Sequence, residues 1–281
     1  MSEQTFPVFV MCGSDARRRE LLQIHDPGRR YKSKAQLPFM GKRLIDWQLE
    51  ALRASPYVGE VYLLGLTETD ILFDDPVRYV PTDAAADFPT KLLDGLVYLR
   101  ALNKDPALIV ISSCDAPAMR TEDVNTFFEQ LIEYAEYDFV LSLVPEAAIK
   151  AVLPEAGRVV ARLRDRDLFP GELYAMSPRG IRVGQQAIRD FTRLRREIDR
   201  SGPRISLGPV IRYLAKKPST WGFLLKYALG LATLADGERM VSATFDCKAR
   251  GIIIDDPGFG MDMDLPEDYE RLKTLMSDRR R

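Results

Sequence analysis

Few residues in this 281-residue sequence could crosslink the chain or form a thiol-based metal centre. Its three cysteines, Cys12, Cys114 and Cys247, are odd in number and far apart, which argues against a disulfide framework or a zinc cluster. His25 is the only histidine, which excludes the usual Ser-His-Asp and Cys-His catalytic groups and histidine-rich metal sites. Any chemistry must therefore rest on carboxylates, lysines and arginines.

Long apolar runs and an excess of one charge are also missing. No stretch approaches the roughly 18 apolar residues of a membrane span, and residues 1–7 lack the basic and apolar parts of a signal peptide. The 40 Lys and Arg residues nearly balance the 41 Asp and Glu residues, so any polyanion site must be local. Basic residues are not interleaved with aromatics as in nucleic-acid-binding proteins. We expect a cytoplasmic protein that neither binds nucleic acid nor spans a membrane.

The sequence does contain a regular alternation of apolar, β-branched segments and amphipathic segments. The first kind predicts strands at residues 7–11, 58–66, 78–81, 107–112, 138–144, 172–176 and 245–255. The second kind predicts helices at residues 43–54, 91–103 and 122–134 and after residues 262–268, with a loop at residues 82–90. This alternation predicts an α/β fold in which helices cover both faces of a mainly parallel sheet.

The second half of the chain has a different pattern. Residues 180–235 are chiefly helical in pattern and are interrupted by prolines. Their many arginines and lysines fit a solvated helix face, and residues 221–235 are apolar enough for a helix that is buried or faces a partner. We interpret residues 1–281 as a single domain that carries residues 180–235 as a helical insertion.

One carboxylate, Asp115, closely follows the strand expected at residues 107–112. In open α/β sheets the ligand crevice lies outside the carboxyl ends of the strands, so an Asp here is a candidate ligand for a divalent cation that carries phosphate. The same residue could instead cap the helix that begins near Thr121. The strand end alone leaves both interpretations open.

The turn after the first strand has the composition of a phosphate-binding loop. The run Cys12–Arg17 (Cys-Gly-Ser-Asp-Ala-Arg) follows the strand directly, and such a turn can point backbone N–H groups at phosphate. Residues 1–43 carry nine basic side chains and four acidic ones, so positive charge gathers beside this strand end. Lys34 lies among apolar neighbours in the run Ser33–Gly41, which we expect to anchor its backbone and aim its ammonium.

Three motifs in this order resemble those of the nucleotidyltransferases related to the molybdenum cofactor guanylyltransferase. They are Cys12–Arg17 with Lys34, then Asp115-Ala-Pro117, then Asp264-Leu-Pro-Glu-Asp268. In that family a glycine-rich turn wraps the triphosphate, a later Lys contacts it, and two Asp residues bind the catalytic magnesium. The resemblance covers most of residues 7–145 and 240–275. It implies a three-layer α/β/α, Rossmann-like GT-A fold with a mainly parallel, mixed sheet.

Carried over residue by residue, the resemblance implies a set of phosphate-binding residues, of which Lys34 and Arg17 would be the catalytic cations. The set is Cys12, Gly13, Ser14, Asp15, Arg17 and Lys34. The implied Mg²⁺ ligands are Asp115 and Asp264, with Asp262 as the alternative to Asp264, because alternation on an extended strand puts both side chains on one face. Nucleotidyl transfer is an in-line attack on an α-phosphate, which needs positioning and cations more than an acid or base.

The implied activity is a Mg²⁺-dependent transfer of a nucleoside monophosphate from an NTP to a phosphorylated small molecule, with release of pyrophosphate. The acceptor would be a sugar phosphate, a polyol phosphate or a cofactor precursor, and residues 180–235 would lie on the acceptor side, where arginines suit phosphate or carboxylate. One alternative is a GT-A glycosyltransferase that uses a nucleotide sugar. Another is a nucleotide-binding protein without turnover, because Cys12 and Asp15 stand where the family has glycines. The base, the acceptor and the oligomeric state stay open, with a homodimer as one option.

Overall fold

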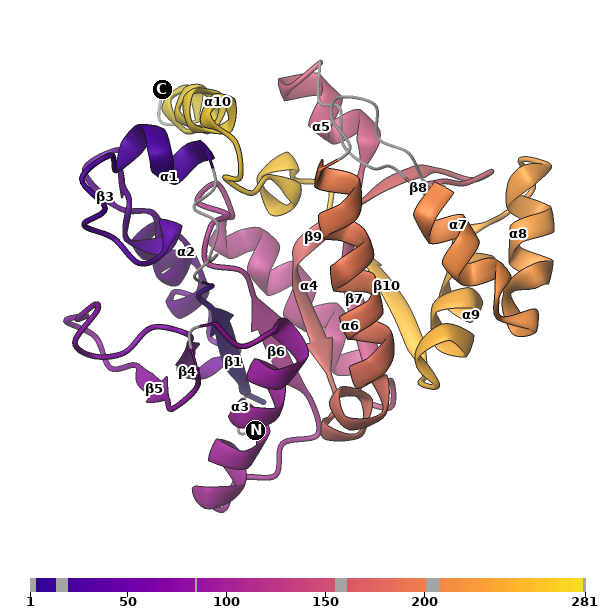
Figure 1. Cartoon of the computed structure of the whole chain (residues 1–281), viewed down its shortest axis with the longest axis horizontal. Helices are drawn as coiled ribbons and strands as arrows, with labels where there is room; N and C mark the ends of the chain where they lie inside the picture. The colour runs from indigo at the N-terminus through magenta and orange to yellow at the C-terminus, as the bar shows by residue number, and fades with distance from the viewer. Residues whose placement is uncertain (1–3, 14–19, 84, 155–160, 201–207, 280–281) are drawn as a thin grey trace.

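The structure is a computed structural model that describes residues 4–13, 20–83, 85–154, 161–200 and 208–279, apart from the side chains of residues 191, 192, 195–200, 208 and 209. Strands occupy the middle of the molecule and helices flank them (Figure 1). The strands are β1 (Phe6–Met11), β2 (Pro38–Phe39), β3 (Lys42–Arg43), β4 (Val58–Leu64), β5 (Arg78–Val80), β6 (Ile109–Ser112), β7 (Phe139–Pro145), β8 (Ala161–Arg162), β9 (Asp167–Met176) and β10 (Ala249–Ile253).

Helices connect most of these strands, as the sequence pattern predicts. The α-helices are α1 (Glu20–His25), α2 (Leu44–Arg53), α3 (Phe88–Ala101), α4 (Thr121–Glu133), α5 (Glu146–Val152), α6 (Pro178–Arg200), α7 (Gly208–Ala215), α8 (Trp221–Ala228), α9 (Leu234–Phe245) and α10 (Pro266–Asp278). Short 3₁₀ turns occur at η1 (Lys34–Gln36), η2 (Pro218–Thr220) and η3 (Pro257–Gly260).

The described residues form an eight-stranded central sheet in the order β10-β7-β9-β6-β1-β4-β5, with β8 paired to β9. Strand β1 is parallel to both of its neighbours, and Val8 and Val10 lie opposite Val110 and Ser112 of β6. Strand β9 is antiparallel to β6 and to β7, between which it lies. The sheet is therefore mixed and mostly parallel, and the predicted fold class is confirmed.

Two apolar cores fill the space between the sheet and its helices, one on each face. The first includes side chains of α2 and α4, namely Ile45, Leu49, Leu52, Val124, Phe127 and Phe128. The second includes side chains of α3, α6 and α9, namely Leu92, Leu96, Leu99, Ile181, Ile188 and Phe245. Each such side chain contributes about 1.5–3 kcal/mol when fully buried. These cores produce the three layers, and they leave the carboxyl ends of β1, β4 and β6 at one edge of the sheet.

A smaller core lies beside this edge and joins segments that are far apart in the sequence. It comprises Leu21, Leu22, Leu37, Phe39, Leu44, Ala118, Met261, Met263, Leu272 and Met276. The ring of His25 stacks on that of Tyr269 with 4.3 Å between centroids, which adds a contact between α1 and α10. Figure 1 shows these two helices side by side. The segment between η3 and α10 is thereby held against the first third of the chain.

Strand β9 and helix α3 are longer than predicted. The sequence predicts a strand at residues 172–176, but β9 begins at Asp167 because its antiparallel pairing with β7 continues to the pair Pro145 and Leu168. Helix α3 begins within the expected loop, because Asp87 caps it by accepting the N–H of Thr90 at 3.0 Å.

The helical region of the second half is also divided differently. Residues 221–235 do not form one helix, because Gly230 adopts a positive φ of 67° and separates α8 from α9. Helix α9 continues to Phe245, so the last strand begins only at Ala249. Of the helices that the structure describes, none has the length and apolar character needed to cross a membrane.

Candidate active site

Asp115 lies in the turn that leads from β6 to α4, at the carboxyl edge of the sheet. The residues of β6 are all buried between β1 and β9, which fixes where this turn begins. Gln48 of α2 holds the turn, because its side-chain oxygen accepts the Ala116 N–H at 3.0 Å and its amide donates to the Ser112 hydroxyl at 2.6 Å. Helix α4 begins at Thr121 without a side-chain cap, so the capping role considered for Asp115 is not realised.

Asp262 and Asp264 alternate with buried methionines on the extended segment before α10. Met263 is fully buried in the smaller core, so both aspartates lie on the opposite side of the backbone. The N–H of Met263 donates to the carbonyl of Asp115 at 2.9 Å, which ties this segment to the turn after β6. The carboxylate of Asp268, in the first turn of α10, accepts the N–H of Asp264 at 3.2 Å.

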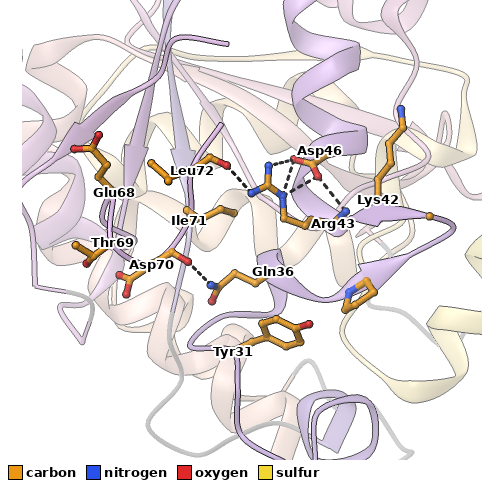
Figure 2. Close-up of a pocket in the computed structure, with 12 residues that line it drawn as sticks. Tyr31, Gln36, Lys42, Arg43, Asp46, Glu68, Thr69, Asp70, Ile71 and Leu72 are labelled. Atoms are coloured by element: carbon orange, nitrogen blue, oxygen red, sulfur yellow. Dashed lines mark hydrogen bonds and ion pairs between the residues drawn. The ribbon is translucent and has the colours of Figure 1, made fainter. Parts of the chain in front are cut away.

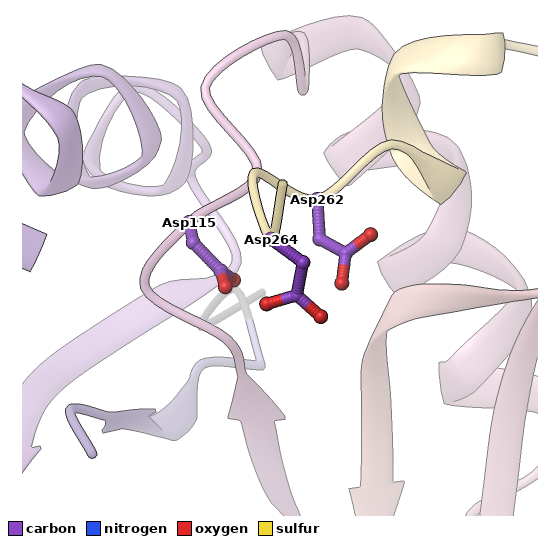
Figure 3. Close-up of side chains that lie close together, drawn as sticks. All are labelled: Asp115, Asp262 and Asp264. Atoms are coloured by element: carbon purple, nitrogen blue, oxygen red, sulfur yellow. The ribbon is translucent and has the colours of Figure 1, made fainter. Parts of the chain in front are cut away.

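These two segments bring three carboxylates together. Oxygen atoms of Asp115, Asp262 and Asp264 all lie within 4.8 Å of one another (Figure 3). Asp115 and Asp262 are each 6% exposed, and Asp264 is half-buried. Buried carboxylates at such a separation repel one another and require a cation.

Lys34 supplies one cation to this cluster. Ser33 caps η1, and its capping box with Gln36 fixes the backbone on both sides of Lys34. The ammonium contacts the carboxylates of Asp115 and Asp264 and donates to the Met263 carbonyl at 3.2 Å. The structure thus joins Lys34 to Asp115 and Asp264, which the sequence analysis singled out separately.

The charges of the cluster are not balanced by Lys34 alone. Burial favours the neutral amine, but the attraction of Asp115, Asp264 and Asp262 outweighs burial and raises the pKa of Lys34. Burial, with repulsion from Asp262 and Asp264, raises the pKa of Asp115 despite the attraction of Lys34. Among the residues that the structure describes, three carboxylates lie beside one ammonium, so these four groups carry a formal excess of two negative charges when ionised. This excess favours the binding of a further cation.

The donor set fits magnesium better than a softer metal. Carboxylate oxygens are hard ligands, and Mg²⁺ commonly takes one or two carboxylates together with waters and substrate phosphate oxygens. The three aspartates lie on two separate segments, the turn after β6 and the segment before α10, which hydrogen-bond to each other. The residues present can therefore hold Mg²⁺ at this edge of the sheet.

The turn after β1 presents its backbone, and not the side chain of Cys12, to this edge. The thiol of Cys12 is fully buried in the core, where burial and the adjacent Cys114 thiol raise its pKa. A cysteine at this position therefore leaves the surface of the turn free of its side chain. Gly13 is exposed, and a Cβ added there would meet no atom within 4 Å. The other expected phosphate-binding residues, Ser14, Asp15 and Arg17, lie outside the described residues.

A buried lysine that the sequence analysis did not single out lies at the same strand ends. Lys91, in the first turns of α3, is 5% exposed, and its Nζ lies 3.5 Å from the carbonyl oxygen of Cys12. Gly65 closes this corner with a φ of 101°, and a Cβ there would lie 1.8 Å from the same carbonyl and 2.9 Å from Nζ of Lys91. Only glycine fits this position. The corner holds a second ammonium beneath the turn after β1.

The structure adds two residues to the site, Gln48 and Lys91, that were not predicted from the sequence, although the sequence contains a signal for each. Gln48 interrupts the apolar face that Leu44, Ile45, Leu49 and Leu52 form on α2, and a polar residue on such a face must find a partner. Lys91 lies among the apolar residues of α3. The sequence predicts that helix to begin at Lys91, and at the first residue of a helix the pattern does not show that the side chain points inward. A lysine is almost never fully buried unless it is paired.

A separate pocket of about 810 Å³ lies on the other side of η1. Its walls are residues of the segment 31–46 and of the loop after β4, and they include neither Lys34 nor the three aspartates. Figure 2 shows Arg43 in its wall, donating to Asp46 and to the Leu72 carbonyl. Gln36 donates to the carbonyl of Asp70 at 2.7 Å across the pocket. These contacts brace the loop after β4 against the segment that carries Lys34.

Several solved structures share this architecture. One, a hypothetical transferase from Thermus thermophilus, has a TM-score of 0.65 and 23% sequence identity, over 95% of this chain and 100% of that one. CMP:2-keto-3-deoxy-manno-octonic acid synthetase, solved with CTP, has a TM-score of 0.52 and 15% identity, over 98% and 99% of the two chains. 4-Diphosphocytidyl-2C-methyl-D-erythritol synthase from Anaerococcus prevotii has a TM-score of 0.51 and 10% identity over the same shares. A comparison with curated protein sequences gives no match.

The fold is therefore that of the GT-A-like nucleotidyltransferases. The family model of the MobA-like NTP transferase domain matches residues 8–170, and this chain belongs to that family. It is a transferase of the nucleotidyltransferase type. The matched range contains Cys12, Lys34 and Asp115, whereas Asp262 and Asp264 follow it.

Proposed function

We propose that this protein uses Mg²⁺ to transfer a nucleoside monophosphate from an NTP to a phosphorylated small molecule, with release of pyrophosphate. The acceptor class is a sugar phosphate, a polyol phosphate or a phosphorylated cofactor precursor. Family membership supports the NTP as the donor. Two of the structural neighbours carry cytidine nucleotides in their names, which supports testing CTP first.

The observation that carries this proposal is the convergence of one lysine and three aspartates at the carboxyl edge of the sheet. Lys34, Asp115 and Asp264 come from three distant parts of the chain and are in direct contact. Burying such a set costs stability unless the charges are paired, so its assembly at a strand edge favours a functional site. The turn at Cys12 and Gly13 ends the neighbouring parallel strand.

Each residue has a separate role in the proposed reaction. Asp115 and Asp264, with Asp262 beside them, would hold Mg²⁺, which when bound supplies positive charge against the phosphate oxygens. The backbone N–H of Gly13 would bind the phosphates, together with Arg17 and the adjoining residues of the turn, whereas the N–H of Cys12 donates to the carbonyl of Leu64. Lys34 would offset negative charge that develops on the transferring phosphoryl group.

Lys91 would provide a further cation for the phosphate chain. Its ammonium lies beneath the Cys12 carbonyl, and so beside the start of the turn that would bind the NTP. An ammonium acts on phosphate as a point charge that does not require a planar arrangement of donors. The role needs only the position that Lys91 has, nearly buried at the carboxyl edge of the sheet.

The test is release of pyrophosphate from each NTP in the presence of sugar phosphates and polyol phosphates. Asp115→Asn removes a proposed metal ligand with little change in shape, and we expect at least a roughly hundredfold loss of kcat/KM. Asp75→Asn is the matched control, because Asp75 is a largely exposed carboxylate that pairs with Arg53. Full activity of Asp115→Asn, or activity that is indifferent to a chelator, would contradict the magnesium assignment.

Two other outcomes would replace the proposed reaction. Transfer from a nucleotide sugar, without pyrophosphate from any NTP, would favour a glycosyltransferase. Tight Mg²⁺-dependent NTP binding without turnover would favour a nucleotide-binding protein, and the double change Cys12→Gly and Asp15→Gly would then be expected to create activity. Because the thiol of Cys12 is buried, we expect the wild-type protein to be active.

A further inference from the structure

Helix α8 exposes large apolar side chains at the edge of the molecule. Trp221, Leu225 and Leu229, which we call the apolar stripe, follow one another at intervals of four residues and are 59%, 64% and 63% exposed. At this spacing they lie on one face of the helix. None of the residues of α8 is buried, and Figure 1 places the helix at the end of the molecule opposite α1. Folding of the described chain leaves this face uncovered.

The exposed stripe has a defined position and is not a frayed segment. The indole N–H of Trp221 donates to the carbonyl of Ala215 at 2.9 Å, which joins α8 to the end of α7. The rings of Phe223 and Tyr227 stack on the other side of α8, with 5.6 Å between centroids. The stripe therefore stays outward while the rest of the helix packs against its neighbours.

Basic side chains border the stripe on two sides. Lys216 is exposed and directly follows Ala215, the last residue of α7, whose carbonyl accepts the indole N–H of Trp221. On the other side, Arg162, Arg164 and Arg166 are exposed on the hairpin of β8 and β9. The backbone N–H of Arg164 donates to the carbonyl of Ala232 at 2.7 Å, which holds the hairpin against the segment after α8. We call Lys216 and the three arginines the basic rim.

Acidic residues are almost missing from this part of the chain. Residues 208–235 contain four basic residues and no acidic one, although the whole chain has a net charge of −1, and one of the four, Lys226, pairs with Asp236 of α9 at 2.7 Å. On the hairpin, Asp165 accepts the N–H of Leu234 at the start of α9 and lies 3.9 Å from the guanidinium of Arg166, so Arg162, Arg164 and Lys216 carry most of the charge of the basic rim. The positive charge around the apolar stripe is therefore local and faces outward with it.

We propose that this face docks on an anionic lipid surface. An apolar stripe with a Trp, flanked by Lys and Arg, is the composition of helices that lie in the membrane interface, where the apolar side chains enter the headgroup boundary and the basic ones meet anionic headgroups. A second copy of the chain fits less well, because a twofold interface between two such faces would bring the basic rims together. The docking is peripheral and does not depend on which reaction the active site performs.

The test uses the full-length protein and flotation with vesicles of phosphatidylcholine, with and without phosphatidylglycerol. We expect binding to the anionic vesicles, weakened by high salt. The double variant Leu225→Glu and Leu229→Glu should lose at least roughly tenfold in partitioning. Val97→Glu is the matched control, because Val97 is 66% exposed on α3, far from this face. The variant Lys216→Gln with Arg164→Gln should lose the preference for anionic vesicles.

Fluorescence of Trp221 gives a second, independent readout. In a Trp47→Phe background Trp221 is the only tryptophan, and its emission should shift to the blue when anionic vesicles are added. Absence of wild-type binding, equal binding to neutral vesicles, or equal binding by the double glutamate variant would overturn the proposal. So would ultracentrifugation that shows a wild-type dimer which the double glutamate variant dissociates, because a second copy would then cover the stripe.

Discussion

The carboxylate cluster and the face of α8 arrange charge and apolar surface in opposite ways. At the cluster, charges are buried and in contact, and apolar residues such as Met263 anchor them from behind. On α8, the apolar stripe is outermost and the charges stand around it. Both arrangements cost stability in a monomer, because one buries charge and the other exposes apolar surface. Each region therefore points to something that it would bind, a cation at the cluster and, as we propose, an anionic lipid surface at α8.

Of the changes considered, Lys34→Ala is expected to have the largest effect on activity, because it removes a cation of the carboxylate cluster. The change removes the ammonium that contacts Asp115 and Asp264, and with it the charge proposed for the phosphoryl group, so we expect roughly a 10²- to 10³-fold loss of kcat/KM. The measurement is pyrophosphate release at saturating Mg²⁺. Lys32→Ala is the control, because Lys32 is 63% exposed and pairs with Asp70 away from the cluster. Equal losses in the two variants would contradict the special role of Lys34.

Alanine substitutions of two glycines at the carboxyl edge should have different effects, one on stability and the other on NTP binding. Gly65→Ala forces a Cβ into the Cys12 carbonyl at a φ of 101°, so we expect a loss of about 3 kcal/mol in the free energy of unfolding, measured in urea. Gly13→Ala meets no atom within 4 Å, so its stability should stay within about 0.5 kcal/mol of the wild type. Its KM for the NTP should rise if the backbone of the turn binds phosphate. Equal stability of the two variants would contradict the geometry of the corner.

Gln48→Leu tests whether the hydrogen bonds of Gln48 position the turn that carries Asp115. The change leaves the buried N–H of Ala116 and the hydroxyl of Ser112 without Gln48, so we expect a loss of about 2 kcal/mol in stability. Because the turn carries Asp115, kcat should also fall while KM for the NTP changes little. Gln186→Leu, at an exposed position on α6, is the control for both measurements. A stable variant with normal kcat would show that the turn does not need Gln48.

Asp138 allows a smaller, pH-dependent test at the junction of β7, α6 and β10. Burial tends to raise its pKa, but hydrogen bonds from Ser177, the Lys248 N–H and Arg179 outweigh burial and lower it. The carboxylate therefore contributes stability above its unfolded pKa of about 4, and this contribution is lost as the pH falls below that value.

Asp138→Asn should accordingly destabilise the protein by about 1 kcal/mol at neutral pH, and by less as the pH falls below about 4. Urea unfolding of both proteins as a function of pH measures this difference. Asp105→Asn, at an exposed position, is the control and should change the free energy of unfolding by less than about 0.5 kcal/mol at neutral pH. A difference that grows toward acidic pH would contradict the sign of the pKa shift.

The smallest effect is expected on the face of α8. Leu225→Ser changes a residue that is 64% exposed, so the free energy of unfolding should stay within about 0.5 kcal/mol of the wild type. Leu49→Ser, on the buried face of α2, should by contrast cost several kcal/mol. Thermal or urea unfolding tests the pair. A strong destabilisation by Leu225→Ser would mean that the stripe packs within the fold.

Local patterns in the sequence predicted the layered fold, whereas the main charged residues of the cluster came from the resemblance to the nucleotidyltransferase family. Apolar segments of strand length give the sheet, and Asp115 followed by Pro117 marks a strand end. The alternation in Met261–Asp264 predicted that Asp262 and Asp264 share a face, and both lie within 4.8 Å of Asp115. Direct contact of Lys34 with Asp115 and Asp264 depends on packing in the smaller core, which no local pattern shows.

Other features follow from tertiary contacts alone. The direction of the Cys12 thiol depends on β1 lying beside β6, and the length of β9 depends on its pairing with β7. The sequence shows the apolar residues of 221–235. Whether each of these side chains is buried or exposed depends on how α8 packs against α7. For that reason the sequence left open whether the helix is buried or faces a partner.

The smaller core also sets an order of events during synthesis. Asp115 and Lys34 lie in the first half of the sequence, whereas Asp262, Asp264 and the anchoring residues Leu272 and Met276 are translated much later. A nascent chain that has already formed β1, β4 and β6 therefore has one carboxylate and an ammonium but no three-carboxylate cluster. Competence for nucleotide chemistry would arise abruptly when α10 packs against α1, so partly made chains should be inert toward NTP and metal.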